Sequence, residues 1–145
     1  MSLNGVAEKA LELECDKVVV VDRWREGIGK ISFFNITSNG LEASPPSLFI
    51  SNILHRRDFG KKIRGRASAV TVNPKDLAKL QQLTNSFSEF FILPFMSLNE
   101  AAKKHIVSLH LMLDSSGNPR ISIMLARQMV EIGPQVTVSK LVWEV

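Results

Sequence analysis

A helix start in the middle of the chain, with strand-like segments on both sides of it, constrains the fold more than any other feature of the sequence. Asn73-Pro74-Lys75-Asp76 combines a residue that commonly caps helices, a proline suited to the first helical position and an acid in the first turn. Leucines follow with helical spacing at positions 77, 80 and 83. These residues predict a helix from Pro74 to about Thr84.

Segments rich in β-branched and aromatic residues flank this helix and predict strands. They span residues 17–24, 29–37, 67–72, 105–113, 120–127, 129–132 and 135–144, and residues 47–54 are predicted as a strand or a short helix. The first two segments are expected to pair as a hairpin. Pro45 and Pro46 predict a loop, and Gly133-Pro134 predicts a break between the last two strands.

Two further short helices complete the expected fold. Residues 6–14 place apolar side chains on one side at helical spacing, and residues 97–104 begin with Ser97 and Glu100, the pair of a capping box. We therefore expect the α+β class, with a curved antiparallel sheet and two or three short helices. The chain has 145 residues and no linker or repeat, so a single domain over residues 1–145 is expected.

Cysteine content and apolar runs exclude several classes of protein. Cys15 is the only cysteine, which excludes an intrachain disulfide and a zinc site with several thiolate ligands, and favours a reducing, intracellular environment. The first residues carry glutamates where a secretory signal needs an apolar run, and no apolar run approaches the roughly 20 residues that span a bilayer. We predict a soluble cytoplasmic protein that does not enter a membrane, with the nucleus or an organelle left open. No cofactor is predicted, because neither GxGxxG nor GxxxxGK[ST] occurs.

Positive charge is concentrated between His55 and Arg66, which we call the basic segment. It holds six basic residues and one acid, a charge of +5 with histidine neutral, in a chain whose total is +4. Closely spaced cations release counterions from a polyanion and so favour phosphate binding. Gly60 and Gly65 let the backbone approach a phosphate strand, and Gly60 is placed for the tip of a β-ribbon. The cations are Arg56, Arg57, Lys61, Lys62, Arg64 and Arg66. The alternative is a solvated loop whose cations aid solubility.

The first hairpin is predicted to extend this cationic surface and to add aromatic rings. Its basic residues are Arg23, Arg25 and Lys30, and the candidate stacking residues are Trp24, Phe33, Phe34 and, within the basic segment, Phe59. Base stacking on a ring contributes about 1 to 3 kcal/mol per base in single-strand binders. Phe33 and Phe34 are adjacent in a strand and face opposite ways, so at most one of them belongs to the core.

The first hypothesis is therefore a non-enzymatic nucleic-acid-binding protein that holds single-stranded DNA or RNA by its backbone, without sequence preference, as a homo-oligomer. No recognition helix with exposed base-reading side chains is evident. An alternative is an assembly or adaptor protein that docks a protein partner through the phenylalanine-rich residues 87–95.

A small metal-dependent enzyme is the third hypothesis. Its candidate acids are Asp22, Asp58 and Asp114, and the chain has three histidines, His55, His105 and His110. In the sequence none of these residues has an evident ordered partner, and His105 and His110 have the odd spacing that separates them on a strand. No catalytic residue and no metal ligand is predicted.

Overall fold

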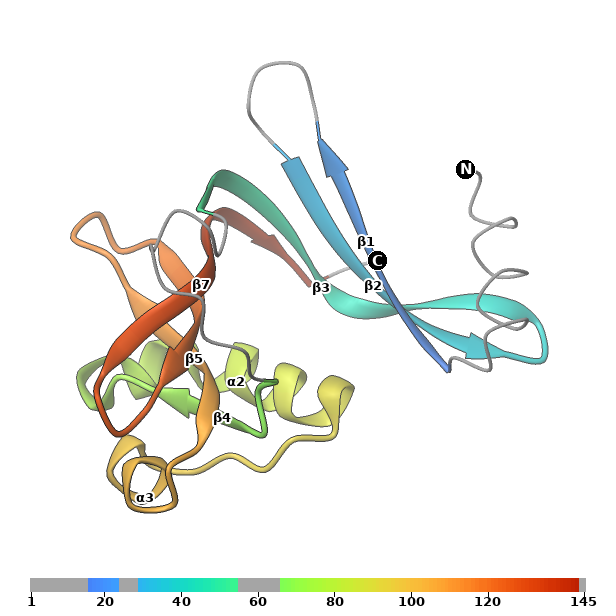
Figure 1. Cartoon of the computed structure of the whole chain (residues 1–145). Helices are drawn as coiled ribbons and strands as arrows, with labels where there is room; N and C mark the ends of the chain where they lie inside the picture. Colours follow the sequence, from blue (N-terminus) through green and yellow to red (C-terminus); the bar gives the residue numbers. More distant parts are fainter. Residues whose placement is uncertain (1–15, 24–28, 55–65, 144–145) are drawn as a thin grey trace. The chain divides into compact units, whose positions relative to one another are not determined.

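The computed structural model describes residues 16–23, 29–54 and 66–143, so the predicted helix at residues 6–14 and residues 55–65 of the basic segment lie outside the described part (Figure 1). The described strands form one sheet in the order β1-β2-β3-β7-β6-β5-β4. Their bounds are β1 (Lys17–Arg23), β2 (Gly29–Thr37), β3 (Gly40–Leu54), β4 (Ala69–Val72), β5 (Val107–Leu113), β6 (Pro119–Leu125) and β7 (Val130–Val142). The helices are the 3-10 helix η2 (Pro74–Asp76) and the α-helices α2 (Leu77–Phe91) and α3 (Leu98–Lys103). This combination confirms the α+β class.

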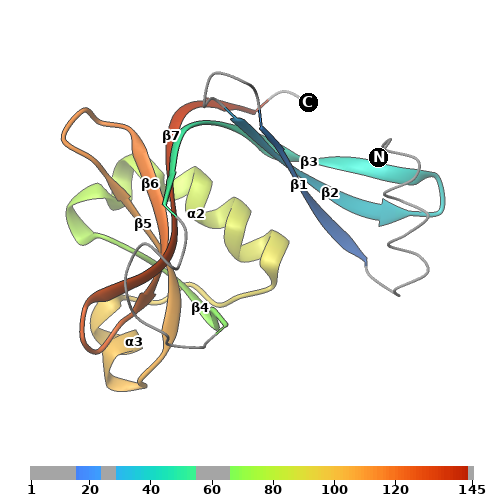
Figure 2. The same cartoon turned by 45° about the horizontal axis from the view of Figure 1, so that its top comes forward.

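Internal contacts divide the chain into two compact units. The first unit contains β1, β2, β3 as far as Ile50, and β7 from Lys140 onward. The second unit, Ser51–Ser139, contains β4, β5, β6, both α-helices and the remaining parts of β3 and β7 (Figure 2). Two strands therefore contribute to both units, and the single domain over residues 1–145 stays a prediction.

The first unit begins with the predicted hairpin, in which β1 and β2 run antiparallel and Arg23 lies opposite Gly29. Glycine is required at position 29, because a Cβ atom there would lie 2.8 Å from the main-chain oxygen of Asp22. Among the described residues of this unit, the apolar side chains of Phe33, Pro46, Leu48 and Ile50 are buried. The hairpin and the buried residues confirm the strands expected at 17–24 and 29–37.

Strand β3 runs without interruption through Pro45 and Pro46, so the loop predicted there is wrong. Ile31 and Phe33 are two residues apart on β2, but their partners on β3, Leu48 and Ser44, are four residues apart. The extra residues of β3 form a bulge. A bulge leaves residues outside the hydrogen-bonded ladder, which suits prolines because they have no N–H to donate.

Strand β7 also contains a proline at a bulge, at Gly133-Pro134. The sequence predicted a break at this dipeptide, and this prediction is also wrong, since β7 continues on both sides of it. Ser122 and Met124 are two residues apart on β6, but their partners on β7, Gln135 and Glu131, are four residues apart. The extra residues of β7 form a bulge. The bulge again places a proline where no ladder bond is needed.

The helix start predicted at Asn73-Pro74 is confirmed, because η2 begins at Pro74 and leads directly into α2. The helix ends at Phe91 rather than near residue 84, since Phe87 and Phe90 continue the apolar spacing and are buried. The following residue, Ile92, has the left-handed φ of 53° that closes many helices.

Asp76 connects the start of this helix to the sheet. Asn73 makes no capping hydrogen bond with its side chain. The buried carboxylate of Asp76 instead accepts a hydrogen bond from the main-chain N–H of Leu113, with Oδ2 and N 3.0 Å apart. The acid predicted for the first helical turn therefore also fixes the end of β5.

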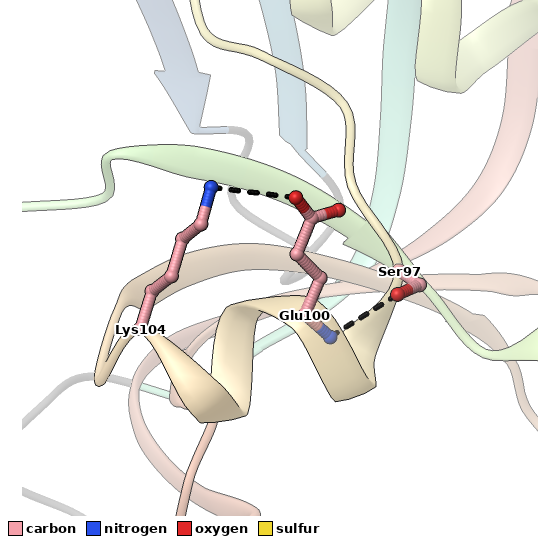
Figure 3. Close-up of polar contacts among 3 residues, drawn as sticks. All are labelled: Ser97, Glu100 and Lys104. Carbon is pink, nitrogen blue, oxygen red and sulfur yellow. Dashed lines mark hydrogen bonds and ion pairs between the residues drawn. The ribbon is translucent and has the colours of Figure 1, made fainter.

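Helix α3 begins as the capping box predicted. The hydroxyl of Ser97 accepts a hydrogen bond from the main-chain N–H of Glu100 at 3.1 Å (Figure 3). One turn later, the ammonium of Lys104 lies 3.3 Å from the carboxylate of Glu100. Both contacts lie on an exposed surface, so they stabilise the helix locally.

The expected antiparallel sheet is mixed, because β4 and β5 pair in parallel, while β1 with β2, β2 with β3, β5 with β6 and β6 with β7 pair antiparallel. A parallel pair needs a long crossover connection, and residues 73–106 with α2 and α3 provide it. Helix α2 packs on β4 and β5, and α3 packs on β4. Helices on the strand explain why all four residues of β4 are buried. No helix in the described ranges is long and apolar enough to cross a membrane.

Candidate nucleic-acid interface

A hollow of about 370 Å³ lies in the first unit, within the range of about 300 to 1,000 Å³ that ligand pockets cover. Strands β2 and β3 and the end of β7 line it. The described lining residues are Lys30, Ser32, Phe33, Phe34, Ala43, Ser47, Phe49, Lys140 and Val142. These described residues comprise two lysines, three phenylalanines and two serines beside small or aliphatic residues, and none of them is acidic.

Strand β2 supplies one row of this lining. Lys30, Ser32 and Phe34 alternate along the strand, so their side chains point to the same side of the sheet. Lys30 lies opposite Phe49 of β3 in the antiparallel register. The bulge at Pro45-Pro46 lies on β3 between the residues opposite Lys30 and those opposite Phe34. Bulges commonly change the direction of side chains beside functional sites.

The two lysines give the hollow a positive charge beside aromatic rings. The Nζ of Lys30 lies 5.6 Å from the ring centroid of Phe49, within the range of a cation–π contact. Lys30 is half-buried, and Lys140 is exposed at the end of β7. An anion next to a planar ring is therefore the ligand chemistry that this lining fits best.

Three of the residues predicted to bind nucleic acid line the hollow, namely Lys30, Phe33 and Phe34. Phe33 is 6% exposed and Phe34 is half-buried, which agrees with the expectation that at most one of the pair is a core residue. Arg23 is the last residue of β1, and Arg66 is exposed in the second unit. The other predicted residues lie outside the described part of the chain: Trp24, Arg25, Arg56, Arg57, Phe59, Lys61, Lys62 and Arg64.

Sequence reasoning missed Phe49 and Lys140 as parts of this lining. Phe49 lies in the segment whose type was left open between strand and helix, so no face could be assigned to it. Lys140 is 110 positions after Lys30, and only the pairing of strands brings the two lysines to one hollow. The alternation of the last strand was visible in the sequence, but it carried no information about the neighbouring strand.

Among the acids and histidines considered for an enzyme, Asp114, His105 and His110 take part in local structure, and Asp22 is exposed on β1. Asp114 accepts hydrogen bonds from the main-chain N–H groups of Ser116 and Asn118, both at 2.9 Å, and so closes the β5–β6 turn. His105 is hydrogen-bonded to Arg127, with Nδ1 and Nη1 2.9 Å apart. In residues 16–23, 29–54 and 66–143, no three His, Cys, Asp or Glu side chains gather as metal ligands would.

A row of buried polar residues crosses the sheet of the second unit. Thr71, His110, Ser122 and Gln135 are successive partners on β4, β5, β6 and β7. The Nδ1 of His110 is hydrogen-bonded to the hydroxyl oxygen of Thr71 at 2.8 Å, and Thr71 donates to the hydroxyl of Ser108 at 3.0 Å. Burial lowers the pKa of His110, and the nearby carboxylate of Asp76 opposes this effect. Thr71, Ser108 and His110 form a hydrogen-bonded cluster within this row, and burial favours the neutral form of His110.

Comparisons with known proteins identify the fold. No protein-family model matches the chain, and a search of curated proteins finds no match. Among solved structures, the chain is similar to the crystal structure of a probable ribosomal biogenesis protein from Aeropyrum pernix K1, with a TM-score of 0.67 and 14% sequence identity. The similarity covers 98% of this chain and 79% of that one. At this identity the likeness shows a shared fold, which extends over nearly the whole chain.

Proposed function

We propose that this protein binds single-stranded nucleic acid, RNA in preference to DNA, and that it does so without catalysing a reaction. The observation that carries the proposal is the hollow of the first unit, where Lys30 and Lys140 lie beside phenyl rings and no described lining residue is acidic. Positive grooves with aromatic platforms are the usual means of holding single strands. The similarity to a probable ribosomal biogenesis protein supports RNA as the partner.

In this proposal each kind of side chain has a separate task. The ammonium groups of Lys30 and Lys140 neutralise phosphates, and the half-buried ring of Phe34 stacks against a base. The hydroxyls of Ser32 and Ser47 lie in the same hollow and are able to hydrogen-bond a ribose 2′-OH. This last contact would distinguish RNA from DNA.

The basic segment adds phosphate contacts that do not depend on sequence. Its six cations and glycines suit a polyanion, and Arg66 at its end is exposed. Charge reversal at Arg64 and Arg66 is expected to weaken binding to all sequences about equally. The formation of a homo-oligomer and a cytoplasmic location belong to the same proposal.

The test compares single-stranded RNA binding of two matched double variants by fluorescence anisotropy over a range of salt concentrations. Lys30→Gln with Lys140→Gln removes the two ammonium groups of the hollow. Lys75→Gln with Lys79→Gln removes the same charge from exposed positions in η2 and α2. The first variant is expected to flatten the slope of log K against log salt by about 1.4, at about 0.7 per lost phosphate contact on a single strand.

The control variant is expected to keep the slope of the unmodified protein. Equal slopes for the unmodified protein and the hollow variant would show that the hollow does not contact phosphate. Phe34→Leu keeps an apolar side chain but removes the ring. It is expected to lower affinity by roughly 5- to 150-fold, the contribution of one stacked base. The same oligomer as DNA is expected to bind more weakly than as RNA.

A second candidate function has support from the phenylalanine-rich residues. Phe87 and Phe90 are buried residues of α2, but Phe91, Ile92 and Phe95 are exposed at 38%, 74% and 44%. Three large apolar side chains exposed within five residues favour an adaptor protein that docks a protein partner. Sedimentation with and without an RNA oligomer separates the two functions, because an adaptor would keep its mass when RNA is added.

A further inference from the structure

Strand β1 forms an open edge of the sheet, because it is at one end of the strand order and pairs with β2 alone among the described strands. The opposite edge is covered. There, the main chain of residues 94–96 bonds to β4: the N–H of Val70 donates to the carbonyl of Pro94, and the N–H of Met96 donates to the carbonyl of Val70. Proteins commonly protect sheet edges in this way, so an edge that no described strand covers calls for an explanation.

The outward-facing groups of β1 follow from its hydrogen bonding to β2. The N–H of Ile36 donates to the carbonyl of Asp16 at 2.8 Å, so the even-numbered residues of β1 form the hydrogen-bonded pairs with β2. The N–H and C=O groups of the odd-numbered residues therefore point away from β2. Val19 and Val21 each present one donor and one acceptor at this edge.

The same two residues also have exposed apolar side chains. Val19 is 44% exposed and Val21 is 50% exposed, and they lie on one face of the strand. An added strand would gain main-chain hydrogen bonds and apolar cross-strand contacts at the same positions. Extended peptides that add to a sheet edge are held by main-chain hydrogen bonds together with side-chain contacts of this kind.

The charges at the ends of β1 oppose pairing with a second copy of the chain in the two registers that pair the most residues of 16–23. Two-fold antiparallel pairing centred on Val19 places the exposed Asp16 opposite the exposed Asp22. Pairing centred on Val20 places Lys17 opposite Arg23, two basic residues. Like charges directly opposite each other destabilise a strand pair, so the edge favours a strand with a different charge pattern.

We propose that β1 accepts an extended segment of another protein as an additional antiparallel strand. The complementary segment has a basic residue opposite Asp22, β-branched residues opposite Val21 and Val19, and an acidic residue opposite Lys17. Read from its N-terminus, this pattern is basic, apolar, any, apolar, any, acidic. The main chain supplies affinity, and the two end charges set direction and register.

The probe is a labelled peptide with the sequence Lys-Val-Thr-Val-Thr-Glu, added to the full chain and followed by fluorescence anisotropy. The control peptide, Glu-Val-Thr-Val-Thr-Lys, has the same composition with its end charges exchanged. The control is expected to bind at least about threefold more weakly, because two cross-strand pairs change from attractive to repulsive. Equal binding of the two peptides, or no binding of either, would overturn the proposal.

Two matched variants locate the binding strand. Val19→Lys with Val21→Lys places charges on the exposed face and is expected to abolish binding of the first peptide. Gln128→Lys with Met129→Lys adds the same charge at exposed residues of the second unit and is expected to leave binding unchanged. Binding that survives the first change, or is lost only with the second, places the peptide elsewhere and refutes the assignment.

Amide hydrogen exchange tests the edge in the unmodified protein. The amides of Val19 and Val21 are expected to exchange quickly in the free chain and slowly with the first peptide, while those of Val18 and Val20 stay protected in both. Protection of Val19 and Val21 without peptide would show that this chain or a second copy already occupies the edge, and the proposal would then be wrong.

Discussion

Acidification is predicted to destabilise the second unit through His110. This side chain is 3% exposed, and its Nδ1 is hydrogen-bonded to the hydroxyl of Thr71. Burial lowers the pKa of His110 below the 6.5 of an unfolded chain, with the charge of Asp76 acting in the opposite direction. The unfolded chain therefore binds a proton at a higher pH than the folded one does.

The size of the effect follows from this difference in proton binding. Above pH 6.5 both states are neutral at this residue, and its contribution to stability is complete. As the pH falls from 6.5 toward the lower pKa of the folded state, the free energy of unfolding is expected to decrease by up to about 1.4 kcal/mol per pH unit, the limit for one proton. The hydroxyls of Thr71 and Ser108, which are linked to the imidazole by hydrogen bonds, carry no charge and do not change this sign.

The assay is urea unfolding followed by circular dichroism at several values between pH 5 and pH 8. His110→Gln keeps a polar side chain that stays neutral, so this variant is expected to lose the stability change that the unmodified protein shows below pH 6.5. His105→Asn is the control, because His105 is exposed and its φ of 54° suits asparagine. If His110→Gln and the unmodified protein respond equally to acid, the reasoning about the buried imidazole is refuted.

Four further substitutions test the described packing and helix ends by urea unfolding. Ile92→Gly is expected to raise the free energy of unfolding by about 0.5 to 1 kcal/mol, because relief of the left-handed strain exceeds the entropic cost of glycine; a loss would show that the exposed side chain contributes contacts. Ser97→Ala is expected to cost about 1 kcal/mol and Lys104→Ala less than about 0.5, so equal losses would contradict the cap in Figure 3. Leu83→Ala, at a residue 2% exposed, is expected to cost about 2 to 5 kcal/mol. A loss under about 1 kcal/mol would contradict the burial of α2.

Elements with short-range signals were predicted well. The start of the helix at Pro74, the cap at Ser97 and the first hairpin all depend on residues a few positions apart, and the structure has them at the expected places. Their physical causes are local: a fixed proline φ, a hydroxyl that accepts an N–H, and runs of β-branched and aromatic residues that favour strands. Elements of this kind need little help from the rest of the chain.

The errors concern strands that contain proline. Pro45-Pro46 and Gly133-Pro134 were read as interruptions, although both lie inside long strands. Proline disrupts a strand only at a position whose N–H would bond to the partner strand. In a bulge, the extra residues lie outside the hydrogen-bonded ladder, so no N–H is needed there. Whether a bulge forms depends on the register of the neighbouring strand, which is not visible in the proline-containing segment itself.

Only part of the candidate site was predicted, because the rest depends on which strands become neighbours. Lys30, Phe33 and Phe34 are neighbours in the sequence and could be chosen together. Phe49 and Lys140 join them only through the pairing of β2 with β3 and the position of β7 in the sheet.

By itself, the sequence determined the class of the fold, the helix starts, the first hairpin and the concentration of positive charge, because each of these depends on residue types within a few positions. The tertiary structure alone decided the parallel pairing of β4 with β5, the continuation of β3 and β7 through their prolines, and the meeting of Lys30 with Lys140 at one hollow. These features depend on which strands become neighbours, and that choice is made by burial and hydrogen bonding across the whole sheet.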